Sequence, residues 1–467
     1  MEFNKQALRQ IVPDETRLIF GSDIPAKYLS DALGRLQGTA DVLVFPISTN
    51  EVSGILRYAH ANRIPVTPRG TGTNLVGSTV PLFGGIIVDL SRMNRILELD
   101  RDTMTATVEP GVLLQNLQAY VEERGFFYPP DPGEKASSIG GNISTNAGGM
   151  RAVKYGVTRD YVRGLEVVLA DGTVLIAGGK QVKDASGLSL KHLLIGSEGT
   201  LAIITKCLLR LIPKPETSVS VLVPYADLET GIQSVLTILR ANANPTAVEF
   251  MERKVVALGE DYSGVRYPRP DAGSYILLTF DGLRSEVNAN VERVRRLALE
   301  HGAMDYIALA DPGQAADIWK VRGALVKAVE AVSQQEPVDI VVPISQTAEF
   351  IRYINRLETS SGMRMISFGH AGDGNVHLCV LRDDRDEETW KRELHATMEQ
   401  AYGKAYQLGG VASGEHGIGV AKRPYFLRQT PRENLAVMNQ IKNALDPNHI
   451  LNDQKSYIGG NKDAEPV

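Results

Sequence analysis

The chain has 467 residues, of which 43% are hydrophobic and 22% are charged, an ordinary globular composition that argues against disorder. One hydrophobic core seldom serves a chain of this length, so we expect two or more domains. The 50 Lys and Arg residues against 55 Asp and Glu residues give a net charge of −5, which offers no electrostatic footprint for nucleic acid.

Targeting and disulfide features are absent from the sequence pattern. No apolar run approaches the roughly 18 residues that span a bilayer. Met1 to Arg9 mixes charged and polar residues and has no signal-peptide core. Cys207 and Cys379 are too few for a disulfide framework, and we interpret both as buried small hydrophobic residues. We therefore expect a cytoplasmic protein with no transmembrane segment.

The first part of the chain alternates helices with short strands. After Asn50, apolar residues follow helical spacing at Val52, Ile55, Leu56 and Ala59. A strand is expected over 85–90. The segments 165–170 and 173–177 flank Asp171-Gly172, a two-residue hairpin signal. This alternation predicts a mixed α+β domain.

The composition changes at Leu211-Ile-Pro-Lys-Pro215, where two prolines should stop regular strand pairing and mark a linker. Beyond it we expect strands over 219–223 and 275–280, and helices over 285–300, 348–358 and 436–445. A four-residue repeat predicts a further helix that stops at Gly409-Gly410, with apolar positions Trp390, Leu394, Met398 and Tyr402. The pattern predicts a second α+β domain of a sheet with covering helices.

The segment Pro68-Arg-Gly-Thr-Gly-Thr-Asn-Leu-Val-Gly-Ser78 predicts an anion cradle. It is no Rossmann motif, because Leu75 stands where the third glycine should be, and no P-loop, because no Lys-Ser or Lys-Thr follows. Its glycines let several backbone N–H groups converge, and its hydroxyl and amide side chains add donors. A pyrophosphate would fit; a plain glycine-rich turn is the alternative.

Two further glycine-rich segments follow. Asp131-Pro-Gly133 precedes Ser137-Ser-Ile-Gly-Gly-Asn-Ile-Ser-Thr-Asn-Ala-Gly-Gly149, whose small residues would let the backbone pack against a flat polar ligand. Gly196-Ser-Glu-Gly-Thr-Leu-Ala-Ile-Ile-Thr205 predicts a tight turn entering a β-branched strand. For either segment alone, an ordinary turn remains the alternative.

Together the three segments resemble the FAD-binding domain of the vanillyl-alcohol-oxidase flavoproteins, also called the p-cresol methylhydroxylase (PCMH) type, over roughly 42–213. The resemblance implies that the first segment holds the FAD pyrophosphate, with Pro68, Arg69, Gly70, Thr71, Gly72, Thr73, Asn74 and Ser78. It implies an isoalloxazine and ribityl lining of Pro110, Gly111, Asp131, Pro132, Ser137, Gly140, Gly141, Asn142, Ser144, Thr145 and Gly148. Glu198, Gly199, Ile203 and Ile204 would meet the adenosine and flavin edges.

The sequence departs from that family in two places. Position 202 is Ala where the family often has Gly, so the closest backbone approach there is open. Some members tether the flavin through a histidine beside the first glycine cluster. Thr73 and Asn74 stand in that neighbourhood, so we expect non-covalent FAD.

Two histidine motifs predict a metal site. They are Gly369-His370-Ala-Gly-Asp-Gly-Asn-Val-His377 and Ser413-Gly-Glu415-His416-Gly-Ile-Gly419. Two imidazoles and a carboxylate would leave coordination positions open for substrate, and the glycines at 372 and 374 would let the chain fold back. A solvated loop is the alternative for any one histidine; no cysteine pair supports a structural zinc site.

These motifs resemble the group of flavoproteins that comprises D-lactate dehydrogenase, D-2-hydroxyglutarate dehydrogenase and the flavin-binding component of glycolate oxidase. The resemblance implies that His370, His377 and Glu415 bind a divalent metal (Zn, Fe or Mn), that His416 is the catalytic base, and that Arg322 grips the substrate carboxylate. Cys379 stands where relatives often have Asn, which leaves the substrate open. Asn452 keeps an expected cofactor contact, although Asp and Gln replace the family's Pro and Gly after it.

We therefore expect an FAD-binding PCMH-type domain over 1–215, a substrate/cap domain over 216–419 with a ferredoxin-like sheet and the metal site, and a segment 420–467 that packs back near the FAD domain. The expected reaction oxidises a small D-2-hydroxy acid, D-lactate or glycolate, by hydride transfer to flavin N5. Electrons would pass to a separate protein, an electron-transferring flavoprotein or an iron–sulfur subunit. The alternatives are oxidation of D-2-hydroxyglutarate or an alcohol, direct reaction with oxygen, and a flavin-bearing electron-transfer subunit without turnover.

Overall fold

The computed structural model describes residues 4–457. The end of the predicted segment 420–467, residues 458–467, lies outside this range. Two compact units are present. The first contains the residues up to Gly148, 157–214 and those from Glu415 onward, and the second contains 149–156 and 215–414. The domain boundaries expected at 215 and 419 remain a prediction, and the compact units divide after Lys214 and Gly414.

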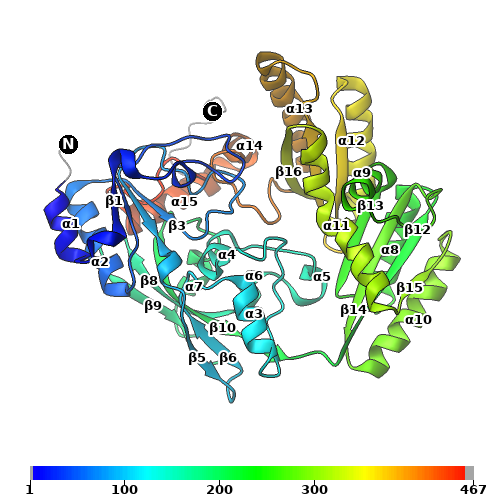
Figure 1. The fold of residues 1–467 in the computed structure, drawn as a ribbon, viewed down its shortest axis with the longest axis horizontal. Coiled ribbons are helices and arrows are strands. Elements are labelled where there is room, and N and C mark those ends of the chain that lie inside the picture. Colours follow the sequence, from blue (N-terminus) through cyan, green and yellow to red (C-terminus); the bar gives the residue numbers. More distant parts are fainter. Residues whose placement is uncertain (1–3, 458–467) are drawn as a thin grey trace. The chain divides into compact units, whose positions relative to one another are not determined.

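A four-stranded sheet begins the first unit (Figure 1). Its order is β1-β2-β4-β3, with β1 (Leu18–Phe20), β2 (Val42–Val44), β3 (Val66–Arg69) and β4 (Ile86–Asp89). Helices α1 (Lys5–Ile11) and α2 (Thr49–Asn62) accompany it. The predicted helix after Asn50 is confirmed as α2: Ser48 caps its first turn, and Val52, Ile55, Leu56 and Ala59 are all buried in the core.

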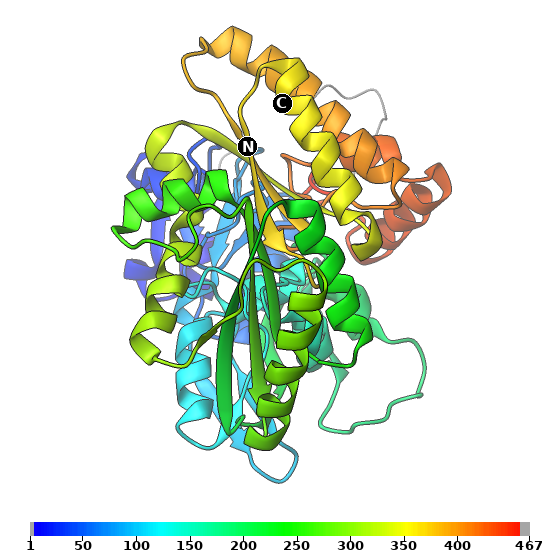
Figure 2. The same ribbon diagram turned by 90° about the vertical axis from the view of Figure 1, so that its right-hand side faces the viewer.

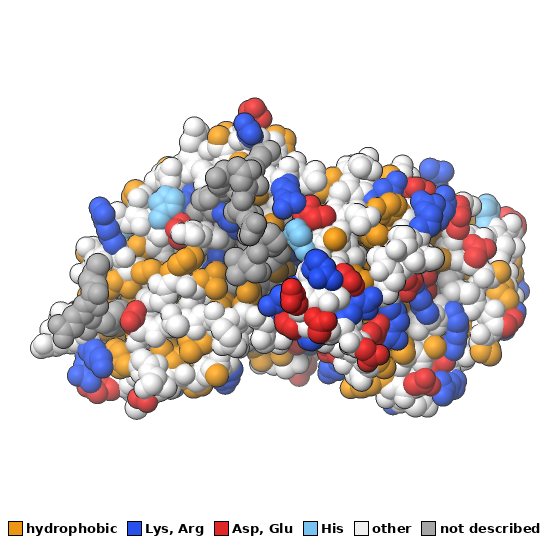
Figure 3. Space-filling view, turned by 90° about the horizontal axis from the view of Figure 1, so that it is seen from above, with side chains coloured by type: hydrophobic (Ala, Val, Ile, Leu, Met, Phe, Trp, Pro, Cys, Tyr) orange, Lys and Arg blue, Asp and Glu red, His pale blue; other side chains and the backbone are white. Residues whose placement is uncertain are grey.

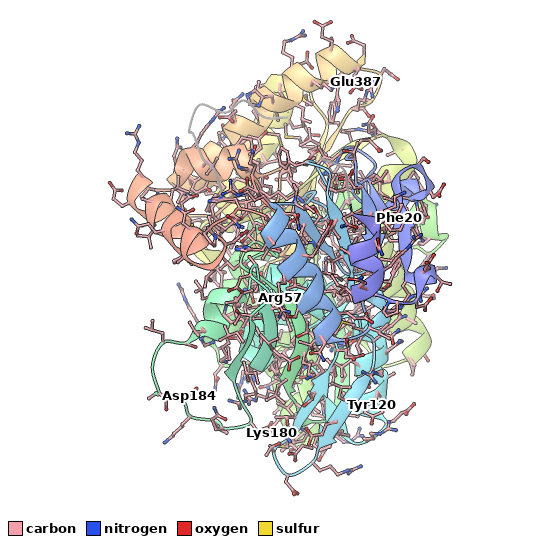
Figure 4. All side chains as sticks on the ribbon, turned by 90° about the vertical axis from the view of Figure 1, so that its left-hand side faces the viewer. Phe20, Arg57, Tyr120, Lys180, Asp184 and Glu387 are labelled. Carbon is pink, nitrogen blue, oxygen red and sulfur yellow. The ribbon has the colours of Figure 1, made fainter. Side chains whose placement is uncertain are left out.

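A five-stranded sheet follows in the order β5-β6-β10-β8-β9. The strands are β5 (Ile96–Asp100), β6 (Thr105–Val108), β8 (Val162–Leu169), β9 (Val174–Gly178) and β10 (Ala202–Arg210). The hairpin predicted at Asp171-Gly172 is confirmed by the antiparallel pairing of β8 with β9. Figure 4 labels Arg57 on α2, which lies against the turn of this hairpin, and Lys180 and Asp184 in the loop that extends beyond β9.

The prolines after Leu211 were expected to stop regular strand pairing, and the pairing at Pro213 is limited to two residues. Strand β11 (Ile212–Pro213) pairs with β7 (Phe126–Phe127) in a two-strand ladder. Proline is tolerated there because the strand has a free edge. The remaining helices of this unit are α3 (Leu114–Glu122), α4 (Ile139–Thr145), α6 (Thr158–Tyr161), α7 (Leu190–Leu194), α14 (Arg423–Gln429) and α15 (Arg432–Leu445).

The second unit is built on an antiparallel seven-stranded sheet of order β15-β12-β14-β13-β17-β18-β16. The strands are β12 (Thr217–Tyr225), β13 (Ala247–Glu252), β14 (Ser274–Gly282), β15 (Ile307–Leu309), β16 (Gln335–Val341), β17 (Met365–His370) and β18 (Asn375–Leu381). Its helices are α8 (Leu228–Arg240), α9 (Arg253–Ser263), α10 (Arg284–Glu300), α11 (Pro312–Val332), α12 (Thr347–Ser361) and α13 (Glu387–Gln407). The predicted α+β class is confirmed.

Helices cover both faces of this sheet. Figure 2 shows strands between two helix layers. On one face α9 and α11 pack on Met251, Tyr275 and Leu277, and on the other α8 and α10 pack on β12 and β14. The alternation of side chains along each strand supplies an apolar surface to each layer.

A short segment, 149–156, belongs to the second unit although it follows the second glycine-rich stretch. It contains α5 (Ala152–Tyr155). Lys154 Nζ donates to Asp281 Oδ1 at 2.6 Å, and the Tyr155 hydroxyl donates to the same oxygen at 2.8 Å. Gly149 and Gly156, with φ of 149° and 79°, flank the excursion.

The described residues contain no helix with an apolar stretch long enough to cross a membrane. On the face seen in Figure 3, basic and acidic side chains are interspersed.

Candidate active site

The two predicted metal-binding histidines lie on one hairpin of the second unit. His370 ends β17, and His377 is the third residue of β18. The turn between them contains Gly374, whose φ of 78° few other residues adopt. The Nε2 atoms of the two imidazoles lie 3.2 Å apart. The predicted fold-back of the chain is therefore confirmed.

Glu249 lies beside this pair and was missed in the sequence analysis. It is in β13, directly opposite His370 in the ladder, and its side chain is fully buried. Its Oε1 lies 2.6 Å from His370 Nδ1. Its Oε2 accepts from Arg322 Nε at 2.9 Å and Nη2 at 2.5 Å. The Glu249 carboxylate thus contacts both His370, which is predicted to bind a metal, and Arg322, which is predicted to bind the substrate.

The charge of Glu249 is stabilised by these neighbours. Burial alone would raise its pKa, but the electrostatic interactions with His370 and Arg322 and the hydrogen bonds from both outweigh burial and lower the pKa below its ordinary value. The carboxyl group is therefore ionised at neutral pH. The only sequence signal was an acidic residue inside the otherwise apolar run Ala247-Val-Glu-Phe-Met251.

Arg322 projects from α11 and is 9% exposed. Its guanidinium carbon lies 5.2 Å from the centre of the Phe368 ring. The edge formed by Nε and Nη2 is occupied by Glu249, and Nη1 makes no hydrogen bond to a residue that the structure describes. Its role in binding a substrate carboxylate stays a prediction, now centred on the Nη1 end of the group.

Glu415 directly follows Gly414, the last residue of the second unit. The buried carboxylate of Asp339 accepts from Gly414 N at 3.1 Å and from Ser413 Oγ at 2.9 Å, which fixes the approach to Glu415. One ligand atom each of His370, His377 and Glu415 lies within 4.8 Å of the others. The structure therefore brings together the three residues predicted to bind a metal.

The segment after Glu415 is irregular, as the adjacent roles of Glu415 and His416 required, and Gly417 has a φ of 82°. Within the first unit, Ile418 N and Gly419 N donate to Glu198 Oε1 and Oε2 at 2.9 and 2.8 Å. Asn74 Nδ2 donates to the His416 carbonyl at 3.2 Å. Predicted FAD-binding residues thus hold the segment that carries the predicted base.

The glycine-rich segments fit a flat polar cofactor. The Ser137 hydroxyl is buried and has no hydrogen-bond partner among the described residues, as expected for a group that meets a ligand. A β-carbon at Gly140 would lie 2.5 Å from Pro110 Cβ, so the backbone packs too closely there for a side chain. Neither the Thr71 nor the Thr73 hydroxyl makes a hydrogen bond within residues 4–457, so both could donate to a phosphate.

Other predicted cofactor residues bind one another and so hold the first and third glycine-rich segments together, which form the cofactor cradle. Ser78 Oγ donates to Glu198 Oε2 at 2.5 Å, so this hydroxyl is already used within the protein. Asn452 Nδ2 donates to the carbonyls of Ser78 and Glu198 at 3.1 and 2.8 Å. Gly199 has a φ of 70°, and a β-carbon at this position would lie only 2.5 Å from Pro68 Cγ. Their predicted FAD contacts stay predictions.

Lys455 contacts two of these residues and gives a prediction for the pH dependence of stability. Its Nζ donates to the Ser78 carbonyl and to Asn452 Oδ1, both at 2.9 Å, and burial lowers its pKa to about 7. Between pH 7 and about 10, the Lys455 amine keeps its proton in the unfolded chain but has lost it in the folded chain. The contribution of Lys455 to the free energy of unfolding therefore rises with pH over this range. Thermal unfolding of flavin-free wild type and Lys455→Met should show this rise in the wild type alone; equal pH slopes would contradict it.

The interpretation of both cysteines is confirmed, since Cys207 and Cys379 are buried free thiols. Cys379 lies in the core under α9 and α11, and burial raises its pKa to about 12. At neutral pH it is therefore an uncharged, apolar residue of β18, two positions after His377 in the histidine hairpin.

A glycine-rich cradle joined to a helix-covered antiparallel sheet with a histidine pair defines a flavin-binding oxidoreductase. Residues 40–178 match the family described as FAD binding domain, and residues 214–456 match the FAD linked oxidases, C-terminal domain. The chain belongs to the family of FAD-linked oxidases.

Relatives and solved structures agree with this assignment. A D-lactate dehydrogenase of Anaerostipes hadrus is 41% identical over 459 residues, which cover 96% of each chain. The glycolate oxidase subunit GlcD of Bacillus subtilis is 38% identical over 435 residues, 92% of each chain. The structure of p-cresol methylhydroxylase with substrate bound has a TM-score of 0.80 at 19% identity, covering 97% of this chain and 96% of that one, and shows a shared fold.

Proposed function

We propose that this chain oxidises a small D-2-hydroxy acid, D-lactate or glycolate, to the 2-oxo acid. The observation that carries the proposal is the convergence of His370, His377 and Glu415, with His416 next in the chain. The similarity to a D-lactate dehydrogenase and to a glycolate oxidase subunit supports the same class of substrate.

In this proposal the chain's own residues bind the acid and move its proton. Bound FAD, held non-covalently, supplies a hydride acceptor at N5. A divalent ion (Zn, Fe or Mn) held by His370, His377 and Glu415 supplies Lewis acidity toward the α-hydroxyl group. His416 accepts the hydroxyl proton, a role that suits an imidazole. Arg322 orients the carboxylate through its remaining donors and so selects which face of the α-carbon is presented.

Cys379 favours a monocarboxylate. It is an apolar core side chain at a position where relatives often carry an amide. A thiol offers a second substrate carboxylate a much weaker hydrogen bond than an amide would, which makes D-2-hydroxyglutarate the alternative substrate rather than the favoured one.

We also propose that the reduced flavin passes its electrons to a separate protein, an electron-transferring flavoprotein or an iron–sulfur subunit. Iron–sulfur clusters are commonly held by four cysteines, whereas this sequence has two, both buried. The two cysteines do not form such a ligand set, which supports transfer of the electrons to a separate protein.

Anaerobic titration of the purified flavoprotein with a panel of acids tests the substrate assignment. We expect D-lactate and, more weakly, glycolate to bleach the flavin absorbance, and L-lactate to leave it unchanged. Bleaching by L-lactate alone would overturn the assignment, and preferential bleaching by D-2-hydroxyglutarate would support the alternative.

A further inference from the structure

We infer that Glu249 is a positioning residue that sets the tautomer of His370 for metal binding and holds Arg322 in place with the same carboxylate. The inference rests on the metal site of the proposed function. It adds a residue to that site and a physical link between its metal-binding and substrate-binding parts.

The first observation is the direction in which His370 is held. Its Nδ1 lies 2.6 Å from a fully buried carboxylate oxygen, and its Nε2 lies 3.2 Å from Nε2 of His377. A neutral imidazole has one N–H and one acceptor nitrogen. The carboxylate fixes the N–H on Nδ1, so the lone pair of Nε2 points toward His377, where an ion would be bound. Histidines that bind metals commonly donate their other N–H to a carboxylate in this way.

The second observation is that both oxygens of Glu249 are used. Oε1 serves His370, and Oε2 serves Nε and Nη2 of Arg322. Phe368 closes the arrangement, because its ring lies 5.7 Å from the His377 ring and 5.2 Å from the Arg322 guanidinium carbon. A displacement of Glu249 would therefore move a metal ligand and the arginine together.

Glutamine cannot replace Glu249 in both roles, although it has the same size. Its amide has one acceptor oxygen and one donor nitrogen. If the nitrogen faces His370, Nδ1 must become the acceptor, and the imidazole proton moves to Nε2, where it blocks metal binding. If the nitrogen faces Arg322, two donors oppose each other in a buried site. Either orientation damages one half of the site.

The test compares Glu249→Gln with Glu252→Gln in flavin-loaded protein stripped of metal by a chelator. Glu252 ends the same strand but faces α12, where it accepts from Asn355, so its substitution is a matched control. Zn²⁺ and Mn²⁺ affinities are measured by competition with an indicator. We expect Glu249→Gln to bind both ions 10- to 100-fold more weakly than wild type, and Glu252→Gln to bind them as wild type does.

Nitrogen NMR of histidine-labelled, metal-free protein supplies a readout that loss of activity does not. We expect wild-type His370 to be protonated at Nδ1, and the Glu249→Gln protein to show an Nε2–H tautomer or two exchanging forms. A wild-type His370 protonated at Nε2 would overturn the inference even if the variant failed to fold, and so would wild-type metal affinity in a folded Glu249→Gln protein.

These outcomes separate the inference from the proposed function. A wild-type protein that binds Zn²⁺ through a Glu249-dependent site but oxidises no hydroxy acid would retain the inference and remove the function. If the wild type oxidised D-lactate and the Glu249→Gln and Glu252→Gln variants bound metal equally well, the proposed function would be retained and the inference about Glu249 would be removed.

Discussion

Replacing His416 with alanine will lower the turnover of D-lactate by about 10²- to 10⁴-fold, because the variant lacks the group proposed to accept the hydroxyl proton. The loss should lie in the reaction itself. Asn74 donates to the carbonyl of His416, a group that alanine retains. Flavin content and metal content should therefore stay at the wild-type level. Steady-state kinetics, flavin absorbance and elemental analysis of the same preparation measure the three quantities.

His192→Ala is the matched control for that experiment. His192 is an exposed residue of α7 that contacts Ser189, outside the proposed site. Its substitution should leave turnover within the error of the wild type. A His416→Ala protein with wild-type turnover would remove this residue from the role of base, whatever becomes of the metal site.

Replacing His370 with alanine will cause the second large effect, a loss of bound metal and with it of D-lactate oxidation. The change removes a proposed ligand and also leaves the buried Glu249 carboxylate without its His370 partner. We expect the metal affinity to fall by more than the roughly 100-fold that loss of an outer partner can cause. Elemental analysis after dialysis and turnover with added Zn²⁺ or Mn²⁺ measure both effects.

The flavin supplies the internal control, because the cradle residues belong to the other compact unit. FAD content should be unchanged in His370→Ala. His301→Ala, at the exposed end of α10, should retain both metal and turnover. Retention of stoichiometric metal by the His370 variant would contradict the ligand assignment.

Local patterns predicted much of the fold. Helices α2, α10, α12 and α13 each bury a face at helical spacing, and Asp171-Gly172 marked a hairpin because few other dipeptides fit so tight a turn. Helix α11 was not predicted. Its buried face contains Arg322 among apolar residues, so the polar side chain interrupts the pattern that would have revealed it.

The candidate site could be predicted only in part. His370 and His377 share one hairpin, so their spacing and glycines indicated their proximity. Glu249 reaches His370 across 121 residues, and no local pattern reports a pairing of β13 with β17. Likewise, Asp339 in β16 accepts a hydrogen bond from Gly414 N, 75 residues further along the chain, and no local pattern indicates this contact. Buried carboxylates that hold other residues in place become visible only once the strands are assembled.

The central claim is that a bound divalent metal assists hydride transfer from a D-2-hydroxy acid to FAD. It is tested most directly by rapid mixing of the flavin-loaded protein with D-lactate without oxygen, before and after removal of metal. We predict fast bleaching of the flavin in the metal-loaded protein, a rate at least about 10²-fold lower after chelation, and recovery when Zn²⁺ or Mn²⁺ is restored. Equal bleaching rates with and without metal would contradict the account.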